Sequence, residues 1–172
     1  MTRTYVITGS ASGIGQSTAQ KLKSLGNTVI GVDIHNADVI ADLSTHGGRI
    51  QAAEKAIATS NNSIDGIIAC AGLAHPTAAT VAVNYFGVTE FINELLPTLT
   101  QSKTPRVAIT SSVASIMPNS TELVEAMCAN DEGKAVEIAQ ALVDAVAGGE
   151  QLIYGSTKRA ISRWIRQQCL KP

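Results

Sequence analysis

The chain has 172 residues and a formal net charge of −1, with 45% hydrophobic and 16% charged residues. This composition is typical of one globular domain with a buried core, and it excludes a disordered chain. Lysine and arginine are scattered and form no basic run, so nucleic acid and an acidic membrane surface are poor candidates as main partners. A small molecule is the better candidate.

The cysteines and histidines indicate neither a disulfide framework nor a metal site. Cys70, Cys128 and Cys169 have no close paired spacing, and the three histidines show no metal-ligand pattern. The N-terminus enters a strand-like run directly, without the apolar stretch of a signal peptide, and no 18-residue apolar segment follows. We therefore expect a soluble cytoplasmic protein without a bound metal.

Strand-like and helix-like segments alternate over the first two thirds of the chain. Short apolar or β-branched runs predict strands at residues 5–8, 28–33, 39–41, 66–70 and 106–110. Between them, helices are predicted at about 14–25, 48–60 and 78–99. In the first helix, Ile14, Ala19 and Leu22 are expected to share one buried face. This alternation predicts a Rossmann-type doubly wound parallel sheet with helices on both faces.

The segment from about 118 to 149 breaks the alternation. It is helix-like and has no strand pattern, so we interpret it as a helical insertion in a single domain that covers residues 1–172. A final helix is predicted from about 154 to 168, with Ile161, Trp164 and Ile165 as its apolar stripe. The strand order does not follow from periodicity.

A glycine-rich loop, Thr8-Gly9-Ser10-Ala11-Ser12-Gly13-Ile14-Gly15, lies between the first strand and the first helix. Its glycines permit a tight turn and let the backbone approach a pyrophosphate at the helix N-terminus. Asp33 ends the second strand 18 residues after Gly15, where a carboxylate can bind ribose hydroxyls and repel a 2′-phosphate. The loop has no Arg or Lys, so NAD is favoured over NADP. The alternative for Asp33 is a solvated strand end.

Tyr154 and Lys158 are four residues apart in Tyr154-Gly155-Ser156-Thr157-Lys158. On a helix they share one face, and the lysine charge can favour ionisation of the phenol, so the pair can move a proton at neutral pH. The same spacing also occurs on many surface helices. Ser112 follows the fifth strand, at the carboxyl end where parallel sheets bind ligands, although such a serine is often only a turn residue.

The glycine spacing resembles the Thr-Gly-x-x-x-Gly-x-Gly loop of the short-chain dehydrogenase/reductase family. Asp42-Leu43 matches the family's acidic–apolar pair beside the adenine, and Ala71-Gly72 matches the end of its Asn-Asn-Ala-Gly motif. Ala69 and Cys70 replace both asparagines, which puts in doubt the hydrogen bonds that steady this strand in the family. The resemblance covers essentially the whole chain and implies these cofactor-binding residues: Gly9, Ser12, Gly13, Ile14, Gly15, Asp33, Asp42, Leu43, Ala71, Gly72, Tyr154 and Lys158.

The resemblance also implies four catalytic residues, Asn84, Ser112, Tyr154 and Lys158. Tyr154 would be the general acid in carbonyl reduction and the base in alcohol oxidation, and Lys158 would also hold the nicotinamide ribose. Ser112, with Ser111 as the alternative, would bind the substrate oxygen, and Asn84 would order a water in a proton relay. The implied function is an NAD(P)-dependent oxidoreductase that interconverts a secondary alcohol and a ketone.

Several stretches, among them Val83-Asn84-Tyr85-Phe86-Gly87, resemble a bacterial branch of hydroxysteroid dehydrogenases and carbonyl reductases. The long segment between Ser112 and Tyr154 resembles the same branch and implies a homo-oligomer, a dimer. Family members continue after the Tyr–Lys helix into two further strands and a substrate loop, which we do not find before Pro172. We therefore expect a fragment of a longer product, a domain completed by a partner, or a non-catalytic NAD-binding or interaction module.

Overall fold

The structure is a computed structural model that describes residues 2–145 and 148–169. By its internal contacts the chain divides into two compact units. Unit 1 comprises Met1–Ala71 and Glu90–Thr110, and unit 2 comprises Gly72–Thr89 and Ser111–Pro172. The expectation of one domain over residues 1–172 stays a prediction.

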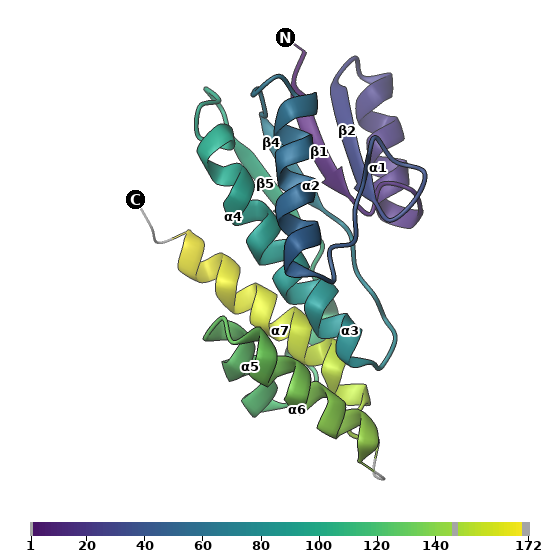
Figure 1. Ribbon diagram of the computed structural model, residues 1–172, viewed down its shortest axis with the longest axis vertical. Helices are drawn as coiled ribbons and strands as arrows, with labels where there is room; N and C mark the ends of the chain where they lie inside the picture. Colours follow the sequence, from purple (N-terminus) through teal and green to yellow (C-terminus); the bar gives the residue numbers. More distant parts are fainter. Residues whose placement is uncertain (1, 146–147, 170–172) are drawn as a thin grey trace. The chain divides into compact units, whose positions relative to one another are not determined.

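Unit 1 is built on a five-stranded sheet in which every neighbouring pair is parallel (Figure 1). The strand order is β3 (Val39–Ile40), β2 (Thr28–Asp33), β1 (Thr4–Thr8), β4 (Gly66–Ala69) and β5 (Arg106–Ile109). These bounds lie within one residue of the predicted ends, and the Rossmann-type doubly wound fold is confirmed. In the described sheet β5 is an edge strand, and residues 106–108 are exposed.

Three helices of unit 1 cover the two faces of this sheet: α1 (Gly13–Ser24), α2 (His46–Thr59) and α4 (Gly87–Leu99), the last from Glu90 onward. The chain moves one way across the sheet from β1 to β2 and the other way from β3 to β4 and from β4 to β5. Right-handed crossovers therefore place α1 on one face and α2 and α4 on the other, where Figure 1 shows the latter two side by side.

Helix α1 packs through Ala19 and Leu22 against Ile7 and Val29 of the sheet. The expectation that Ile14 shares this buried face is wrong, because its side chain is 64% exposed. Five residues separate Ile14 from Ala19, which turns the two side chains about 140° apart around the helix. Ile14 therefore lies on the solvent side of the first turn of α1, at the end of the glycine loop.

Unit 2 is helical in its described residues. Its elements are α3 (Ala78–Val81), the π-helical turn η1 (Ala82–Phe86), the 3-10 turn η2 (Val113–Ile116), α5 (Thr121–Cys128), α6 (Glu132–Asp144) and α7 (Gln151–Gln168). Helices α5 and α6 lie in the range 118–149 where the sequence predicts a helical segment, of which residues 146 and 147 lie outside the described residues. Whether they form an insertion stays a prediction.

Helix α7 is the centre of unit 2 and packs against η2, α3 and α5. It begins three residues before the predicted start at 154 and ends at the predicted residue, 168. Of the predicted apolar stripe, Ile161 is buried, whereas Trp164 and Ile165 are half-buried. The amino-terminal half of α7 is the more deeply buried half, and this half carries Tyr154 and Lys158.

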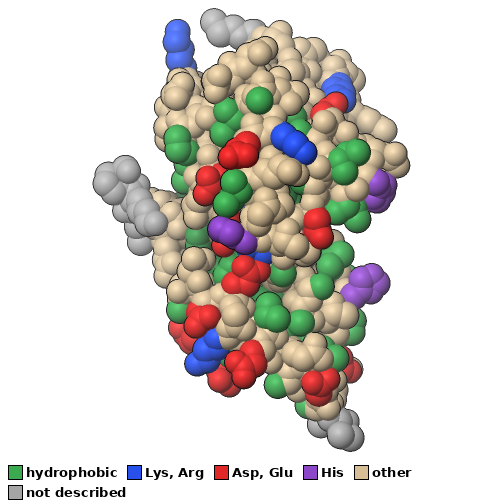
Figure 2. All heavy atoms as spheres, viewed as in Figure 1, with side chains coloured by type: hydrophobic (Ala, Val, Ile, Leu, Met, Phe, Trp, Pro, Cys, Tyr) green, Lys and Arg blue, Asp and Glu red, His purple; other side chains and the backbone are tan. Residues whose placement is uncertain are grey.

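On the face drawn in Figure 2, Lys and Arg side chains lie singly among Asp and Glu side chains and form no basic stripe. This distribution agrees with the scattered charges of the sequence. Within the part of the chain that the structure describes, no helix combines the length and the apolar character needed to cross a membrane.

Candidate functional site

The glycine loop of unit 1 is a place of close backbone packing. A Cβ atom on Gly15 would lie 2.1 Å from the carbonyl oxygen of Gly9, and a Cβ on Gly9 would lie 2.7 Å from the backbone nitrogen of Ala71. Gly9 also has a φ of +70°, a left-handed conformation that favours glycine. The first turn of α1, the loop and the end of β4 thus touch through backbone atoms, and a larger residue at either position displaces them.

The N-terminus of α1 is open to an anion. Ser12, the residue before the helix, is extended, and its side chain makes no capping hydrogen bond. The first backbone N–H groups of a helix have no partner within the helix, and the helix dipole adds a partial positive charge there. The predicted position of a pyrophosphate therefore coincides with a helix end that can bind one.

Asp33, at the end of β2, holds the glycine loop. Its Oδ2 accepts a hydrogen bond from the backbone nitrogen of Ala11 at 2.9 Å, and its Oδ1 accepts one from Ile34 at 2.7 Å. The side chain is 12% exposed, so Asp33 is more than a solvated strand end. Each carboxylate oxygen has a further lone pair with which it can accept a hydrogen bond from a hydroxyl group.

The end of β4 is held by threonines in place of the family's two asparagines. The Oγ1 of Thr8 accepts hydrogen bonds from the backbone nitrogens of Cys70 at 3.2 Å and Ala71 at 3.1 Å. The hydroxyl of Thr110 donates to the Cys70 sulfur at 3.3 Å. The replacement by Ala69 and Cys70 therefore leaves this strand end tied to both neighbouring strands.

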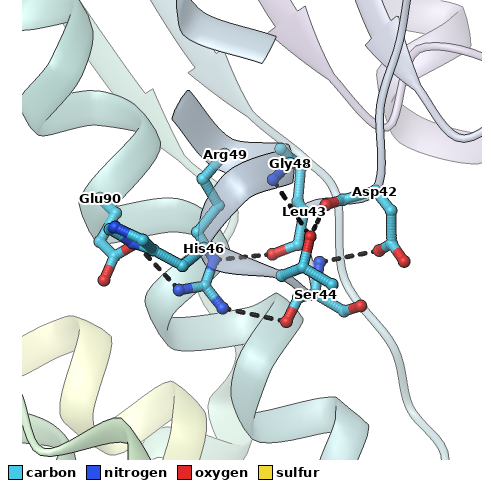
Figure 3. A network of polar contacts seen from close by, with 8 residues as sticks. Asp42, Leu43, Ser44, His46, Gly48, Arg49 and Glu90 are labelled. Carbon is cyan, nitrogen blue, oxygen red and sulfur yellow. Dashed lines mark hydrogen bonds and ion pairs between the residues drawn. The ribbon is translucent and has the colours of Figure 1, made fainter. Parts of the chain in front are cut away.

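The turn that contains Asp42 and Leu43 is held by Arg49, a residue that the sequence analysis missed (Figure 3). Arg49 is fully buried and forms an ion pair with Glu90 of α4, with a nitrogen–oxygen distance of 2.9 Å. Burial raises the pKa of Glu90, but hydrogen bonds from Arg49 and His46 outweigh it, so the net shift is downward. A charged residue after two glycines is usually solvated, and no pattern in the sequence distinguishes this one.

In unit 2, Tyr154 and Lys158 lie one helical turn apart on α7, as predicted. The Lys158 Nζ lies 5.6 Å from the centroid of the Tyr154 ring, within the range of a cation–π contact. Lys158 is 7% exposed, whereas Tyr154 is half-buried. The geometry therefore places a desolvated positive charge beside a phenol that solvent can reach.

Two of the three residues between this pair, Gly155 and Ser156, hold α7 close to the segment before α5. A Cβ on Gly155 would lie 3.0 Å from the carbonyl oxygen of Pro118, so glycine permits a close approach. The hydroxyl of Ser156 accepts a hydrogen bond from the Ser120 nitrogen at 2.9 Å and donates to the Leu152 carbonyl at 2.8 Å. Thr157 donates to the Tyr154 carbonyl at 2.8 Å.

Asn84 lies in the π-helical turn η1, and its side chain is fully engaged. Its Oδ1 accepts from the Leu73 nitrogen at 2.7 Å, and its Nδ2 donates to the Leu73 carbonyl at 2.9 Å and to the Thr157 hydroxyl at 3.3 Å. The side chain of Asn84 therefore binds segments outside its own helix. Thr157 precedes Lys158, so Asn84 is linked to the turn of α7 that carries the Tyr–Lys pair. Single π-helical turns are frequent at functional sites.

Ser112 caps the turn η2, where its Oγ accepts a hydrogen bond from the Ala114 nitrogen at 3.1 Å. A hydroxyl that accepts in this way can still donate its own proton. Ser111, the alternative, is exposed, and its Oγ lies 3.5 Å from the hydroxyl oxygen of Ser162. The neighbouring apolar side chains are exposed: Val113, Ile116 and Met117.

The predicted site residues are thus divided between the two units. Unit 1 contains the predicted residues Gly9, Ser12, Gly13, Ile14, Gly15, Asp33, Asp42, Leu43 and Ala71. Unit 2 contains Gly72, Asn84, Ser112, Tyr154 and Lys158. Unit 1 thus presents features of a nucleotide site and unit 2 those of a proton-transfer site, and their assignment as a cofactor site and a catalytic site stays a prediction.

Comparison with known proteins gives consistent matches. The family model described as short chain dehydrogenase matches residues 3–122. A 3-alpha-hydroxysteroid dehydrogenase/carbonyl reductase of Comamonas testosteroni is 38% identical over 168 residues, which cover 95% of this chain. The chain spans 64% of the length of that relative. A coniferyl-alcohol dehydrogenase of a Pseudomonas species is 41% identical over 91 residues, 48% of this chain and 34% of that protein.

Among solved structures, a 3-alpha-hydroxysteroid dehydrogenase from Pseudomonas sp. B-0831, complexed with NADH, matches with a TM-score of 0.88 and 38% identity. The match covers 96% of this chain and 71% of that one. Menthone neomenthol reductase from Mentha piperita, at 19% identity and a TM-score of 0.73, shares the fold; the match covers 98% of this chain and 85% of that one.

Proposed function

Because the chain belongs to the short-chain dehydrogenase family, we propose that it carries the NAD-binding and proton-transfer residues of an oxidoreductase that interconverts a secondary alcohol and a ketone. Its similarity to the two hydroxysteroid dehydrogenases suggests hydroxysteroids as the first substrate class to test. The observation that carries this proposal is the buried Lys158 ammonium beside the half-buried Tyr154 ring.

The residues of unit 1 fit NAD. The glycine loop lets a pyrophosphate approach the uncapped N-terminus of α1, and Asp33 has acceptor capacity left for the adenosine ribose. The negative charge of Asp33 disfavours the 2′-phosphate of NADP. When bound, NAD supplies or accepts the hydride. In the proposal Asp42, Leu43 and Ala71 complete the adenosine side, and Gly72 of unit 2 is a further cofactor-binding residue.

The residues of unit 2 would handle the proton. In ketone reduction the Tyr154 hydroxyl donates its proton to the substrate oxygen, and in alcohol oxidation the phenolate accepts it. The Lys158 ammonium stabilises that phenolate and can bind a ribose hydroxyl. Ser112 donates a hydrogen bond to the substrate oxygen, and Asn84 positions the turn that carries Lys158 through Thr157.

The proposal includes assembly as a homo-oligomer, a dimer, which the family resemblance implies. Light scattering of the purified protein tests it independently of activity: a mass of twice 17.9 kDa supports a dimer, and a monomer mass contradicts it.

Tyr154→Phe tests the catalytic proposal. We expect turnover of hydroxysteroids or small ketones with NADH to fall about 10³-fold, because general acid–base catalysis is lost. NADH binding, measured by fluorescence titration, should stay near that of the wild type. Tyr5→Phe, which removes the same hydroxyl from β1, is the matched control and should leave turnover unchanged.

Two outcomes would contradict the catalytic proposal. Full turnover by Tyr154→Phe removes Tyr154 from the mechanism. A wild-type protein that binds NADH but turns over none of the alcohols and ketones supports the alternative, a non-catalytic NAD-binding module.

A further inference from the structure

Arg49 is the largest fully buried side chain of the described residues, and it lies beside a turn that the proposed function assigns to the cofactor. We propose that Arg49 is a positioning residue, which holds the Asp42–Ser44 turn in the conformation that binds the adenine end of NAD. The inference rests on the proposed function. It adds a residue that acts on NAD binding through the turn and not by contacting NAD itself.

The guanidinium of Arg49 joins the turn to α4 (Figure 3). Its Nε donates to the Leu43 carbonyl at 2.9 Å, and its Nη2 donates to the Ser44 carbonyl at 3.1 Å. Its Nη1 pairs with the Glu90 carboxylate at 2.9 Å. One planar group therefore fixes two successive carbonyls of the turn relative to a helix that covers the sheet.

The burial of this charge requires a reason other than stability. Arginine is almost never fully buried unless it is paired, and a buried ion pair is often no more stabilising than apolar side chains of similar volume. An apolar residue would fill the same space between α2 and α4. It would not bind the carbonyls of Leu43 and Ser44, so the specific effect of Arg49 is on the conformation of the turn.

The other contacts of the turn show how closely its path is specified. The Asp42 Oδ1 accepts a hydrogen bond from the Ser44 nitrogen at 2.8 Å, and Thr45 caps α2 by accepting from the Gly48 nitrogen at 3.1 Å. A Cβ on Gly48 would lie 1.9 Å from the Asp42 carbonyl oxygen. Leu43 is buried and Asp42 is exposed, so the Asp42 carboxylate faces solvent while the next residue fixes the turn to the core.

Loss of these two carbonyl contacts leaves the turn to be ordered when the ligand binds. Ordering a segment on binding reduces affinity, because the conformational entropy that the segment loses makes the net free energy of binding less favourable. The reduction applies to ligands that contain the adenosine part. Ligands that contain only the nicotinamide part do not contact this turn, so their affinity should not change.

The test compares the affinities of ADP-ribose and reduced nicotinamide mononucleotide for Arg49→Lys and the wild type, both measured by competition with NADH. Lysine keeps the charge opposite Glu90, but a single ammonium cannot bind both carbonyls with the geometry of the fork. We expect ADP-ribose to bind about tenfold more weakly and the mononucleotide to bind unchanged. Glu90→Gln, which keeps Arg49 and its two carbonyl contacts, should change the ADP-ribose affinity by about twofold at most.

Ile64→Ala is the control for a purely structural effect. Ile64 is 2% exposed and precedes β4 at the amino end of the sheet, whereas the turn follows β3 at the carboxyl end. Thermal melting should show that Ile64→Ala is destabilised at least as much as Arg49→Lys, yet the ratio of the two affinities should equal that of the wild type.

Three results would overturn the inference. In the first, Arg49→Lys keeps the wild-type affinity for ADP-ribose. In the second, Arg49→Lys loses affinity for both ligands equally, or Ile64→Ala changes their ratio as Arg49→Lys does. In the third, the wild type binds neither NADH nor ADP-ribose, which would also refute the proposed function, whereas the first two leave that function intact.

Discussion

The glycine loop of unit 1 and the Tyr–Lys segment of unit 2 are held in place by different means. In the loop, backbone atoms touch backbone atoms, and a Cβ on Gly15 would lie only 2.1 Å from a carbonyl oxygen. Around Tyr154, single side-chain hydroxyls and one amide bind backbone groups, as Ser156 and Asn84 do. The glycine loop is therefore fixed mainly by backbone packing, with a side-chain contact from Asp33, whereas the Tyr–Lys segment is fixed mainly by individual hydrogen bonds, with one close backbone approach at Gly155.

Gly15→Ala should break the loop and have the largest effect. The added methyl group cannot be accommodated without moving the backbone of Gly9, so we expect loss of detectable NADH binding. The free energy of unfolding should fall by about 3 kcal/mol or more. Fluorescence titration and urea denaturation measure the two effects.

Gly47→Ala is the matched control for that substitution. A Cβ on Gly47 meets nothing within 4 Å in the first turn of α2, where alanine is a better helix former than glycine. It should leave NADH binding unchanged and not lower stability. Normal NADH binding by Gly15→Ala would show that shape does not fix the loop.

Ser156→Ala tests the hydrogen-bonded side and should have a smaller effect. It leaves the Ser120 backbone nitrogen without its partner at the start of α5, so the free energy of unfolding should fall by about 1–2 kcal/mol. Turnover should fall only moderately. Ser162→Ala removes a half-buried hydroxyl that donates to the Lys158 carbonyl of its own helix and has only a long, 3.5 Å contact with the exposed Ser111 hydroxyl, so it should stay within about 0.5 kcal/mol of the wild type. An equal decrease in the free energy of unfolding in both variants would show that the hydrogen bond between Ser156 and the Ser120 nitrogen does not stabilise unit 2.

Asp65→Asn should have the smallest effect on stability. It removes a charged side chain that accepts hydrogen bonds in unit 1, away from the glycine loop. Hydrogen bonds from the Ser102 hydroxyl and the Thr4 nitrogen hold the pKa of Asp65 below its usual value of 3.8. The pKa of Asp65 is lower in the folded state than in the unfolded state. Asp65 therefore contributes to the free energy of unfolding at pH values above its unfolded pKa, and this contribution is lost as pH falls through its folded pKa. The side chain is accessible to solvent, so the contribution should stay below about 1 kcal/mol.

Urea denaturation at several values from about pH 6 to about pH 3 measures this difference. The stability gap between the wild type and Asp65→Asn should narrow as pH falls. Glu54→Gln removes a carboxylate from an exposed position on α2 and should show no comparable gap. A stability difference between the wild type and Asp65→Asn that does not change with pH would contradict the lowered pKa of Asp65.

The strands and the glycine loop could be predicted from the sequence because their signals are local. Buried parallel strands such as β2 are continuous apolar runs, and glycine permits backbone contacts that no other residue allows. The exposure of Ile14 does not follow from its apolar character, because a residue in the first helical turn is buried only where its angle around the helix matches that of Ala19 and Leu22. The sequence gives no sign that Arg49 is buried, because its partner Glu90 lies 41 residues away.

The contacts of Asn84 could not be predicted from the sequence either. Its place in a helix was predicted, but its hydrogen bonds to Leu73 and Thr157 depend on segments that are distant in the chain. The link between Asn84 and the Tyr–Lys segment therefore follows from the tertiary structure and not from the motif itself.

The π-helical turn at Ala82–Phe86 has a consequence for the evolution of the chain. A π-turn accommodates one residue more than a regular helical turn, so it sets the rotational phase of the helix that follows it. A one-residue deletion there would rotate Val88 and Thr89, both buried, by about 100° away from their present positions. Insertions and deletions should therefore be rarer in this turn than in the loops, even where individual residues are exchanged freely.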